Sequence, residues 1–183
     1  MKIKKSYING LLIITPNVFS DNRGYFFESF NSESFRKSGL PTDFMQDNES
    51  KSQKGVVRGL HFQSPPVAQG KLVRVIKGSV IDVAVDIRKG SKTYGKWHSE
   101  LLSGENKKLF WVPPGFAHGF QTLENDTIFS YKCSGLYHKE SEGSLFWNDP
   151  NIGINWDFSI EPIVSEKDKV APLLSDLESP FIY

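Results

Sequence analysis

The chain has 183 residues, 38% of them hydrophobic and 23% charged, which is ordinary for a soluble globular protein with one substantial core. A net charge of +1 without any Lys/Arg block argues against binding to nucleic acid or to an anionic membrane. The single cysteine, Cys133, excludes a disulfide framework and a cysteine-built zinc site. An early apolar run, Leu11 to Ile14, is too short to span a bilayer, and no small-residue cleavage site accompanies it. We therefore expect a cytoplasmic protein with a single domain over residues 1–183.

The first quarter of the chain predicts two strands and one helix. The segment Ile8 to Pro16 is a strand that ends at proline, and the polar run Ser20 to Gly24 is a turn. An aromatic strand, Tyr25 to Phe30, follows. The segment Asn31 to Ser38 predicts a short helix that begins at a capping Asn or Ser and ends at Gly39.

From Val56 onward the pattern is that of β-structure. Lys71 to Ile76 alternates, Lys77 to Ser79 is a tight turn, and Val80 to Ile87 alternates again with its apolar residues on one face. Further strands are expected at Trp97 to Leu102, Lys108 to Val112, Gly119 to Leu123 and Thr127 to Lys132, with a short helix from Ser165. This pattern predicts an antiparallel all-β domain with one dominant hydrophobic face. A closed barrel or jelly roll is favoured because closure removes exposed strand edges.

Four histidines are the first candidates for chemistry. His98 and His138 lie in polar surroundings, so we expect both side chains to be solvated. His61 and His118 lie in apolar stretches that contain glycine, and glycine lets a backbone approach a ligand closely. From the local sequence alone, a hydrogen-bonded core histidine is an equally good interpretation of either.

Strand periodicity identifies two further candidates. If Thr127 to Lys132 is a strand, Thr127, Phe129 and Tyr131 share one face, and an inward tyrosine needs a hydrogen-bond partner or a wet pocket. Lys71 shares a face with Val73 and could also point inward. The alternative for Lys71 is a solvated side chain at the end of a strand.

Arg58 and His61 would lie on opposite faces of a regular strand. Arg58 therefore sits at a bend or serves another pocket, such as that of a neighbouring subunit; the spacing does not choose between these. A metal site would need several imidazoles and a carboxylate to converge, yet the chain has no His-x-His pair. We therefore expect no metal.

Several motifs occur in an order typical of one known family. They are Asp21-Asn22-Arg23-Gly24-Tyr25-Phe26-Phe27-Glu28, Gln46-Asp47-Asn48-Glu49-Ser50, Arg58-Gly59-Leu60-His61-Phe62-Gln63, Gln69-Gly70-Lys71-Leu72-Val73-Arg74-Val75, Pro113-Pro114-Gly115-Phe116-Ala117-His118-Gly119-Phe120, Tyr131-Lys132-Cys133 and Ser165-Glu166-Lys167-Asp168. With these motifs, residues 3–183 resemble the dTDP-4-dehydrorhamnose 3,5-epimerases, a branch of the cupin superfamily.

The resemblance implies a jelly-roll barrel that forms a homodimer with strand exchange near the N-terminus. It implies epimerisation of dTDP-4-dehydro-6-deoxy-D-glucose at C3 and C5 to dTDP-4-dehydro-L-rhamnose, a step of dTDP-L-rhamnose biosynthesis. It also implies no cofactor, in agreement with the missing His-x-His pair.

The resemblance further implies four catalytic roles. His61 is the base, and Asp168 orients its imidazole. Lys71 faces the C4 oxygen and stabilises the enolate, while Tyr131 returns a proton from the opposite face. This set suits the chemistry, because the protons at C3 and C5 flank a ketone and their removal gives an enolate.

The implied substrate-binding residues fall into three groups. Arg23, Arg58 and Lys167 suit the pyrophosphate, since guanidinium and ammonium groups bind phosphate oxygens. Hydrogen bonding to thymine and sugar is expected of Glu28, Gln46, Asp47 and Asn48. Tyr137 is expected to stack on the thymine, with simple packing as the alternative, and His118 and Glu142 to line the pocket.

Two other functions remain open at this stage. A 3-epimerase acting on the same nucleotide sugar would share the His, Lys and Tyr, although the Tyr131 to Tyr137 spacing and the whole-chain match favour double epimerisation. A non-catalytic cupin that binds nucleotide sugars is disfavoured because the set His61, Lys71, Tyr131 and Asp168 is complete.

Overall fold

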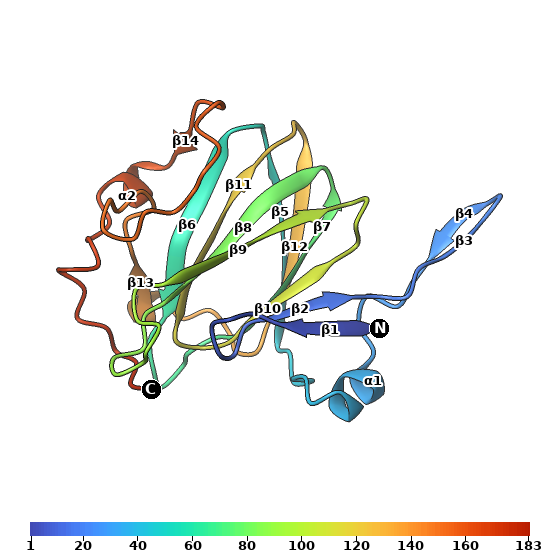
Figure 1. Cartoon of the computed structure of the whole chain (residues 1–183), viewed down its shortest axis with the longest axis horizontal. Coiled ribbons are helices and arrows are strands. Elements are labelled where there is room, and N and C mark those ends of the chain that lie inside the picture. Colours follow the sequence, from blue (N-terminus) through green and yellow to red (C-terminus); the bar gives the residue numbers. More distant parts are fainter.

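The structure, a computed structural model that describes residues 1–183, consists of two facing sheets with short helices outside them (Figure 1). The first sheet contains, in spatial order, β1 (Lys2–Lys5), β2 (Leu12–Thr15), β10 (Leu109–Val112), β7 (Lys71–Lys77), β12 (Thr127–Cys133) and β5 (Gln46–Ser52). The second contains β13 (Glu142–Ser144), β6 (Val56–Gln63), β11 (Phe116–Thr122), β8 (Ser79–Asp86) and β9 (Trp97–Ser103). The expected all-β barrel is confirmed.

The helices are short and peripheral, as expected. They are α1 (Ser32–Lys37), a single 3-10 turn (Lys139–Ser141) and α2 (Glu166–Lys169). Asn31 caps α1, because its side chain accepts a hydrogen bond from the Ser34 N–H at 3.0 Å. Ser165 caps α2 in the same way. Next to α2, β14 (Ile163–Val164) pairs in parallel with the beginning of β6.

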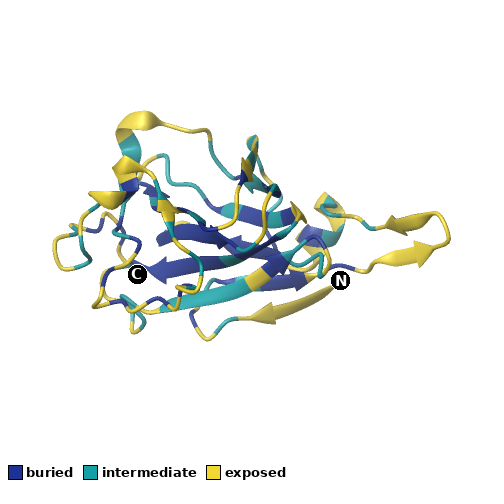
Figure 2. Cartoon of the chain, turned by 90° about the horizontal axis from the view of Figure 1, so that it is seen from above, coloured by how far each residue is buried: buried dark blue, intermediate teal, exposed yellow.

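The N-terminal region differs from the expectation. Gly10 has a φ of +105°, which places a turn inside the expected strand, so that β2 begins only at Leu12 and pairs back onto β1. The aromatic strand is reduced to β4 (Gly24–Phe26), which pairs only with β3 (Phe19–Asp21). This hairpin projects away from both sheets (Figures 1 and 2).

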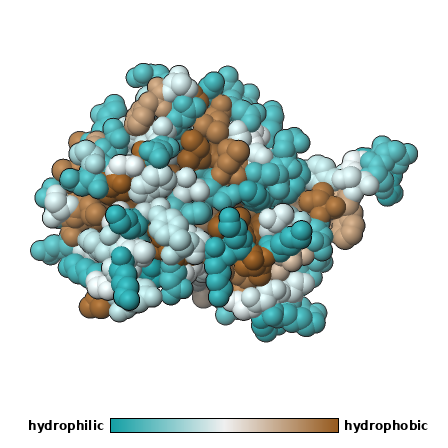
Figure 3. All heavy atoms as spheres, viewed as in Figure 1, coloured by the Kyte–Doolittle hydropathy of each residue, from teal (hydrophilic) through white to brown (hydrophobic).

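The projecting hairpin exposes large apolar side chains. Phe19, Tyr25 and Phe26 are between 57% and 67% exposed, and Figure 3 shows apolar surface on this arm. Contiguous apolar surface of this kind is typical of a face that another molecule covers.

β8 is buried on both faces, whereas the sequence predicted one dominant hydrophobic face. Its residues Val80 and Ala84 belong to the core between the sheets. Val83, Val85 and the following Ile87 share one face, as their alternation predicted, but this face points outward into a second core. β6 and β11 contribute to that second core as well, and the C-terminal third of the chain adds Leu145, Trp147, Ile152, Ile154, Trp156 and Phe181. The irregular C-terminal segment is thereby packed onto the outside of the second sheet.

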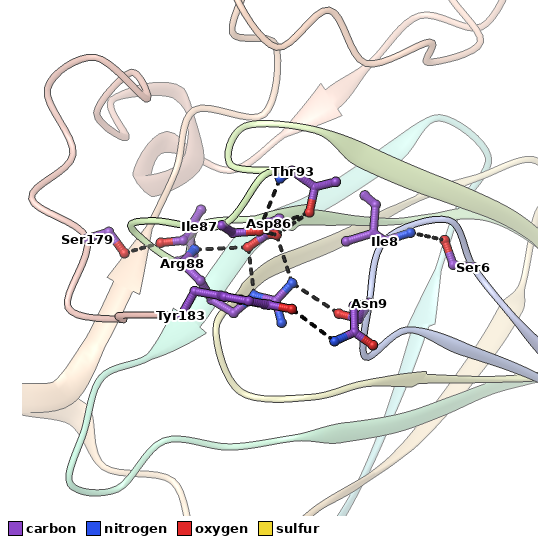
Figure 4. Close-up of polar contacts among 10 residues, drawn as sticks. Ser6, Ile8, Asn9, Asp86, Ile87, Arg88, Thr93, Ser179 and Tyr183 are labelled. Carbon is purple, nitrogen blue, oxygen red and sulfur yellow. Dashed lines mark hydrogen bonds and ion pairs between the residues drawn. The ribbon is translucent and has the colours of Figure 1, made fainter.

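A buried polar network fixes one end of the barrel (Figure 4). The carboxylate of Asp86, which is fully buried, accepts hydrogen bonds from Arg88 Nε and Nη2 at 2.8 Å and from the Thr93 hydroxyl at 2.7 Å. The Arg88 guanidinium lies between the rings of Phe116 and Tyr183, 4.4 and 4.9 Å from their centroids. These contacts tie the C-terminal residues to the first residue of β11.

Candidate active site

A cleft lies between the two sheets, where side chains of β5, β7 and β12 face those of β6 and β11. It consists of a main cavity of about 490 Å³ and a side cavity of about 340 Å³, which share His61, Lys71 and Tyr131. The main cavity is lined by Ser50, Val56, Val57, Arg58, His61, Lys71, His118, Gly119, Phe120, Phe129, Tyr131, Ile163, Val164, Ser165, Lys167 and Asp168. The side cavity adds Gln46, Asn48, Phe62, Gln63, Gln69, Cys133, Tyr137 and Glu142.

Arg58 and His61 line the same cavity because β6 is irregular between them. His61 pairs with His118 and Arg58 pairs with Phe120, so three steps along β6 match two along β11. The extra residue of such a bulge returns the two side chains to one face. Gly59, with a φ of +120°, permits it, since a Cβ there would lie 2.7 Å from the Cα of Gly119. Of the two possibilities for Arg58, the bend is the one that the structure contains.

His61 forms a close pair with a carboxylate from the distant end of the chain. Its Nε2 lies 2.6 Å from Asp168 Oδ1, and the two side chains are 30% and 5% exposed. Ser165 caps the beginning of α2 by accepting a hydrogen bond from the Asp168 N–H, and the Asp168 side chain faces β6. There the carboxylate of Asp168 also accepts a hydrogen bond from the Gly59 N–H. Burial opposes the charged form of Asp168, but the hydrogen bond and charge of His61 outweigh it and hold the pKa below its ordinary value. The pair can therefore hold one imidazole orientation and support an imidazolium.

Lys71 and Tyr131 reach the cleft from the opposite sheet. Tyr131 pairs with Val73, and Lys71 pairs with Cys133, on the adjacent strands β12 and β7. Burial raises the pKa of Tyr131, which keeps its phenol protonated through the neutral range. Burial lowers the pKa of Lys71, and the charges of neighbouring acidic groups partly counter this. Both inward orientations agree with strand periodicity.

A second His–carboxylate pair lies deeper, and its acidic member, Asp82, was not among the residues predicted from the sequence. His118 Nε2 is 2.8 Å from Asp82 Oδ1; the side chains are 6% and 0% exposed. The other oxygen of Asp82 has no hydrogen-bond partner, and burial raises the pKa of this carboxyl while His118 and Lys71 lower it. Strand alternation puts Asp82 on the face opposite Ile81 and Val83, and because those residues form the apolar face of this strand, the sequence would have predicted that Asp82 points outward.

Charged and aromatic side chains surround the mouth of the cleft. Lys167 forms an ion pair of 2.6 Å with Glu142, whose carboxylate also accepts a hydrogen bond of 3.1 Å from the Tyr137 hydroxyl. Burial alone would raise the pKa of Glu142, but Lys167 and Tyr137 lower it below its ordinary value. Arg58, on β6, donates from Nε to the hydroxyl of Ser52 on β5 at 3.1 Å.

Three of the predicted binding residues lie outside the cleft of this chain. Asp47 lies on the outer face of β5 and pairs with Lys132, whereas Gln46 and Asn48 face the side cavity. Arg23 lies at the tip of the projecting hairpin and pairs with Asp21. Glu28, which follows that hairpin, accepts a hydrogen bond from Asn31. Asp47 could have been separated from its neighbours by alternation.

The remaining histidines lie outside the cleft. His138 is solvated, as expected, with a side chain that is 52% exposed. For His98 the expectation was wrong, because its ring packs against Tyr7 and Phe110 and its side chain is only 18% exposed.

No group of three His, Cys, Asp or Glu side chains is arranged as a metal site. None of the helices has both the length and the hydrophobicity that a membrane-spanning segment requires.

Comparison with known proteins identifies the family. Residues 5–176 match the family model described as dTDP-4-dehydrorhamnose 3,5-epimerase. The enzyme of that name from Salmonella typhimurium is 54% identical over 175 residues, which cover 95% of this chain and 96% of the relative.

Solved structures agree with the sequence match. The structure of a dTDP-6-deoxy-D-glucose-3,5-epimerase from Legionella pneumophila, in complex with dTDP-4-keto-L-rhamnose, has a TM-score of 0.93 at 48% identity and covers 97% of this chain and 94% of its own. A 3′-monoepimerase from Streptomyces bikiniensis, in complex with dTDP-quinovose, has a TM-score of 0.88 at 35% identity, with coverages of 93% and 86%. The expected cupin-type jelly roll is thereby confirmed. The chain belongs to the dTDP-4-dehydrorhamnose 3,5-epimerase family.

Proposed function

We propose that this protein inverts C3 and C5 of dTDP-4-dehydro-6-deoxy-D-glucose, giving dTDP-4-dehydro-L-rhamnose for dTDP-L-rhamnose biosynthesis. The observation that carries the proposal is that a histidine–carboxylate pair and a protonated tyrosine enter one cleft from facing sheets, with Lys71 beside them. Inversion requires a base and an acid on opposite faces of one carbon. Family membership supports both the reaction and a dTDP-sugar substrate.

In the proposed mechanism His61 takes the proton from C3, and the electron pair of the broken C–H bond forms an enolate with the C4 carbonyl. Because Nε2 of His61 is hydrogen-bonded to Asp168, Nδ1 is the ring nitrogen that is free to accept the proton from C3. Asp168 stabilises the resulting imidazolium, and Lys71 stabilises the enolate oxygen. Tyr131 then protonates C3 from the other face. Exchange with solvent restores neutral His61 and protonated Tyr131, and the same steps invert C5.

The nucleotide would lie along the mouth of the cleft. Arg58 and Lys167 would bind the pyrophosphate, Lys167 by exchanging its Glu142 partner for phosphate oxygens. Tyr137 would stack on the thymine, since the residue is 54% exposed. The side cavity would place Gln46 and Asn48 near polar groups of the thymine and sugar, with His118 and Glu142 lining the pocket. No cofactor or metal takes part in these steps.

The protein would act as a homodimer that exchanges its projecting hairpin. Burial of this arm on a second copy would cover its exposed aromatic residues. Arg23 and Glu28 would then belong to the partner's site, which accounts for their distance from the cleft of their own chain. The outer face of β5 with Asp47 would lie at this interface.

The test is proton NMR of the protein with its ketosugar nucleotide in deuterated water. Exchange at both C3 and C5 is expected, and exchange at C3 alone would instead indicate the 3-epimerase, a function known for the Streptomyces relative. Complete absence of exchange would refute an enzymatic role and leave only binding. In His61→Ala, loss of nearly all exchange is expected, and unchanged exchange would remove His61 from the role of base.

A further inference from the structure

Most hydrogen bonds to the backbone of the loop that carries Tyr137 come from side-chain amides, whereas a strand would be bonded to the backbone of its neighbour. This segment, residues 134–138, is called the Tyr137 loop here. The N–H of Tyr137 donates to Gln46 Oε1 at 2.8 Å, and the next N–H, that of His138, donates to Gln63 Oε1 at 2.8 Å. Two successive backbone donors of the loop are therefore satisfied by glutamine amides.

The carbonyl groups just before Tyr137 are satisfied in the same way. Gln63 Nε2 donates to the Leu136 carbonyl at 3.0 Å, and Gln69 Nε2 donates to the Gly135 carbonyl at 2.7 Å. Gln63, a residue that is 4% exposed, thus contacts the loop on both sides of Tyr137 with one amide. Four consecutive residues of the loop are bonded to three glutamines that come from β5, β6 and the segment before β7.

Little else determines how the Tyr137 ring lies. More than half of the residue is exposed, and the one side-chain hydrogen bond is that of its hydroxyl to Glu142. Because no core packing holds the ring, its direction depends on the conformation of the loop backbone. Losing the glutamine contacts would release that backbone and leave polar groups beside the side cavity unpaired.

We propose that Gln63 and Gln69 are positioning residues, which hold the Tyr137 loop in the conformation that presents the tyrosine ring to the thymine of the nucleotide sugar. This inference rests on the stacking role of Tyr137 given under Proposed function. A ring that is already oriented binds a flat base without a further ordering step. If the loop of a variant adopts the binding-competent conformation in only a fraction f of the molecules, the apparent Kd for the nucleotide rises by a factor of 1/f.

The test compares Gln69→Met and Gln63→Met, which remove the amide but preserve length and charge. Binding of dTDP is measured by calorimetry, and kcat and KM by the NMR assay. For each variant we expect Kd and KM to rise at least about fivefold while kcat changes less than about twofold, because the reacting groups lie on strands. Gln69 is only half-buried, so Gln69→Met carries the test if Gln63→Met does not fold.

The matched control is Gln121→Met. Gln121 makes the same paired contacts to a different loop: its Nε2 donates to the Asp157 carbonyl at 3.0 Å, and its Oε1 accepts from the Asp157 N–H at 2.8 Å. This variant should lose stability but keep the dTDP affinity. If it weakened dTDP binding as much as Gln69→Met does, the effect would be one of general stability and the inference would be overturned.

A double-mutant cycle with Tyr137→Ala separates this inference from the stacking proposal. If the glutamines act through the ring, Gln69→Met should have little further effect on dTDP affinity in the Tyr137→Ala background. A full effect of Gln69→Met in that background would overturn the inference and leave stacking intact. Unchanged dTDP affinity in Tyr137→Ala itself would instead refute the stacking role.

Discussion

Replacing Asp168 by asparagine removes a charge while it preserves the shape of the His61 pair. The two side chains are 2.6 Å apart, and that of Asp168 is 5% exposed, so solvent screens the interaction little. A hydrogen bond to a charged group contributes about 1.5–3 kcal/mol. If this support is needed mainly when the imidazolium forms, kcat should fall about 10- to 150-fold, since each 1.36 kcal/mol is a factor of about ten.

The assay is solvent deuterium uptake at C3 under saturating substrate, followed by NMR. The loss should appear in kcat with KM nearly unchanged, because in the proposed mechanism Asp168 acts on the base and does not contact the nucleotide. Asp176→Asn, which changes an exposed carboxylate on the same C-terminal segment, is the matched control and should leave kcat unchanged. A change confined to KM, or an unchanged kcat, would refute the role of Asp168 in supporting the imidazolium.

The same variant makes a prediction for stability. The pKa of Asp168 is lowered in the folded protein, so its charged form stabilises the fold above the unfolded-state pKa, and this stabilisation is lost as the pH falls through the folded-state pKa. The difference in unfolding free energy between the wild type and Asp168→Asn should therefore be largest near neutral pH and shrink at acid pH. Urea unfolding across this range measures it. A difference that grows toward acid pH would contradict the sign of the shift.

Three further outcomes follow from other residues. Tyr131→Phe should slow inversion more than proton abstraction, and an equal fall of epimerisation and deuterium uptake would remove Tyr131 from the role of acid. The pKa of Lys71 lies below its ordinary 10.5, so Lys71 should lose its charge, and kcat should decline, before the pH reaches that value. Lys71→Arg should flatten this decline. A wild-type decline that begins only above pH 10.5 would contradict the role of the Lys71 charge. Arg88→Met should destabilise the fold by about 3 kcal/mol, since it leaves the buried Asp86 carboxylate without its cation. Lys37→Met, at an exposed pair, is the control in urea unfolding and should change stability by less than about 1 kcal/mol.

Much of the site could be predicted from local periodicity. Alternation along β12 and β7 directs Tyr131 and Lys71 inward because successive side chains of a strand point to opposite faces. The same rule, applied to β5, would have identified Asp47 as outward. For Asp82 it gives the wrong direction, because the alternating apolar residues of β8 lie on the outer face of the sheet. It could not predict that Arg58 and His61 share a face, since the bulge in β6 depends on the close approach of Gly59 to Gly119 on a neighbouring strand.

The sequence by itself determined most of the central β-strands, the two short helices and the inward direction of Tyr131 and Lys71, because these depend on neighbours a few positions away. Its ordered motifs also indicated the family. Only the tertiary structure decided which carboxylate meets His61, since Asp168 lies 107 positions further along the chain. It also decided that glutamines from three segments converge on the Tyr137 loop. It decided as well that the hairpin with Arg23 projects away from the cleft of its own chain. Such contacts depend on how distant segments pack together, which no local pattern encodes.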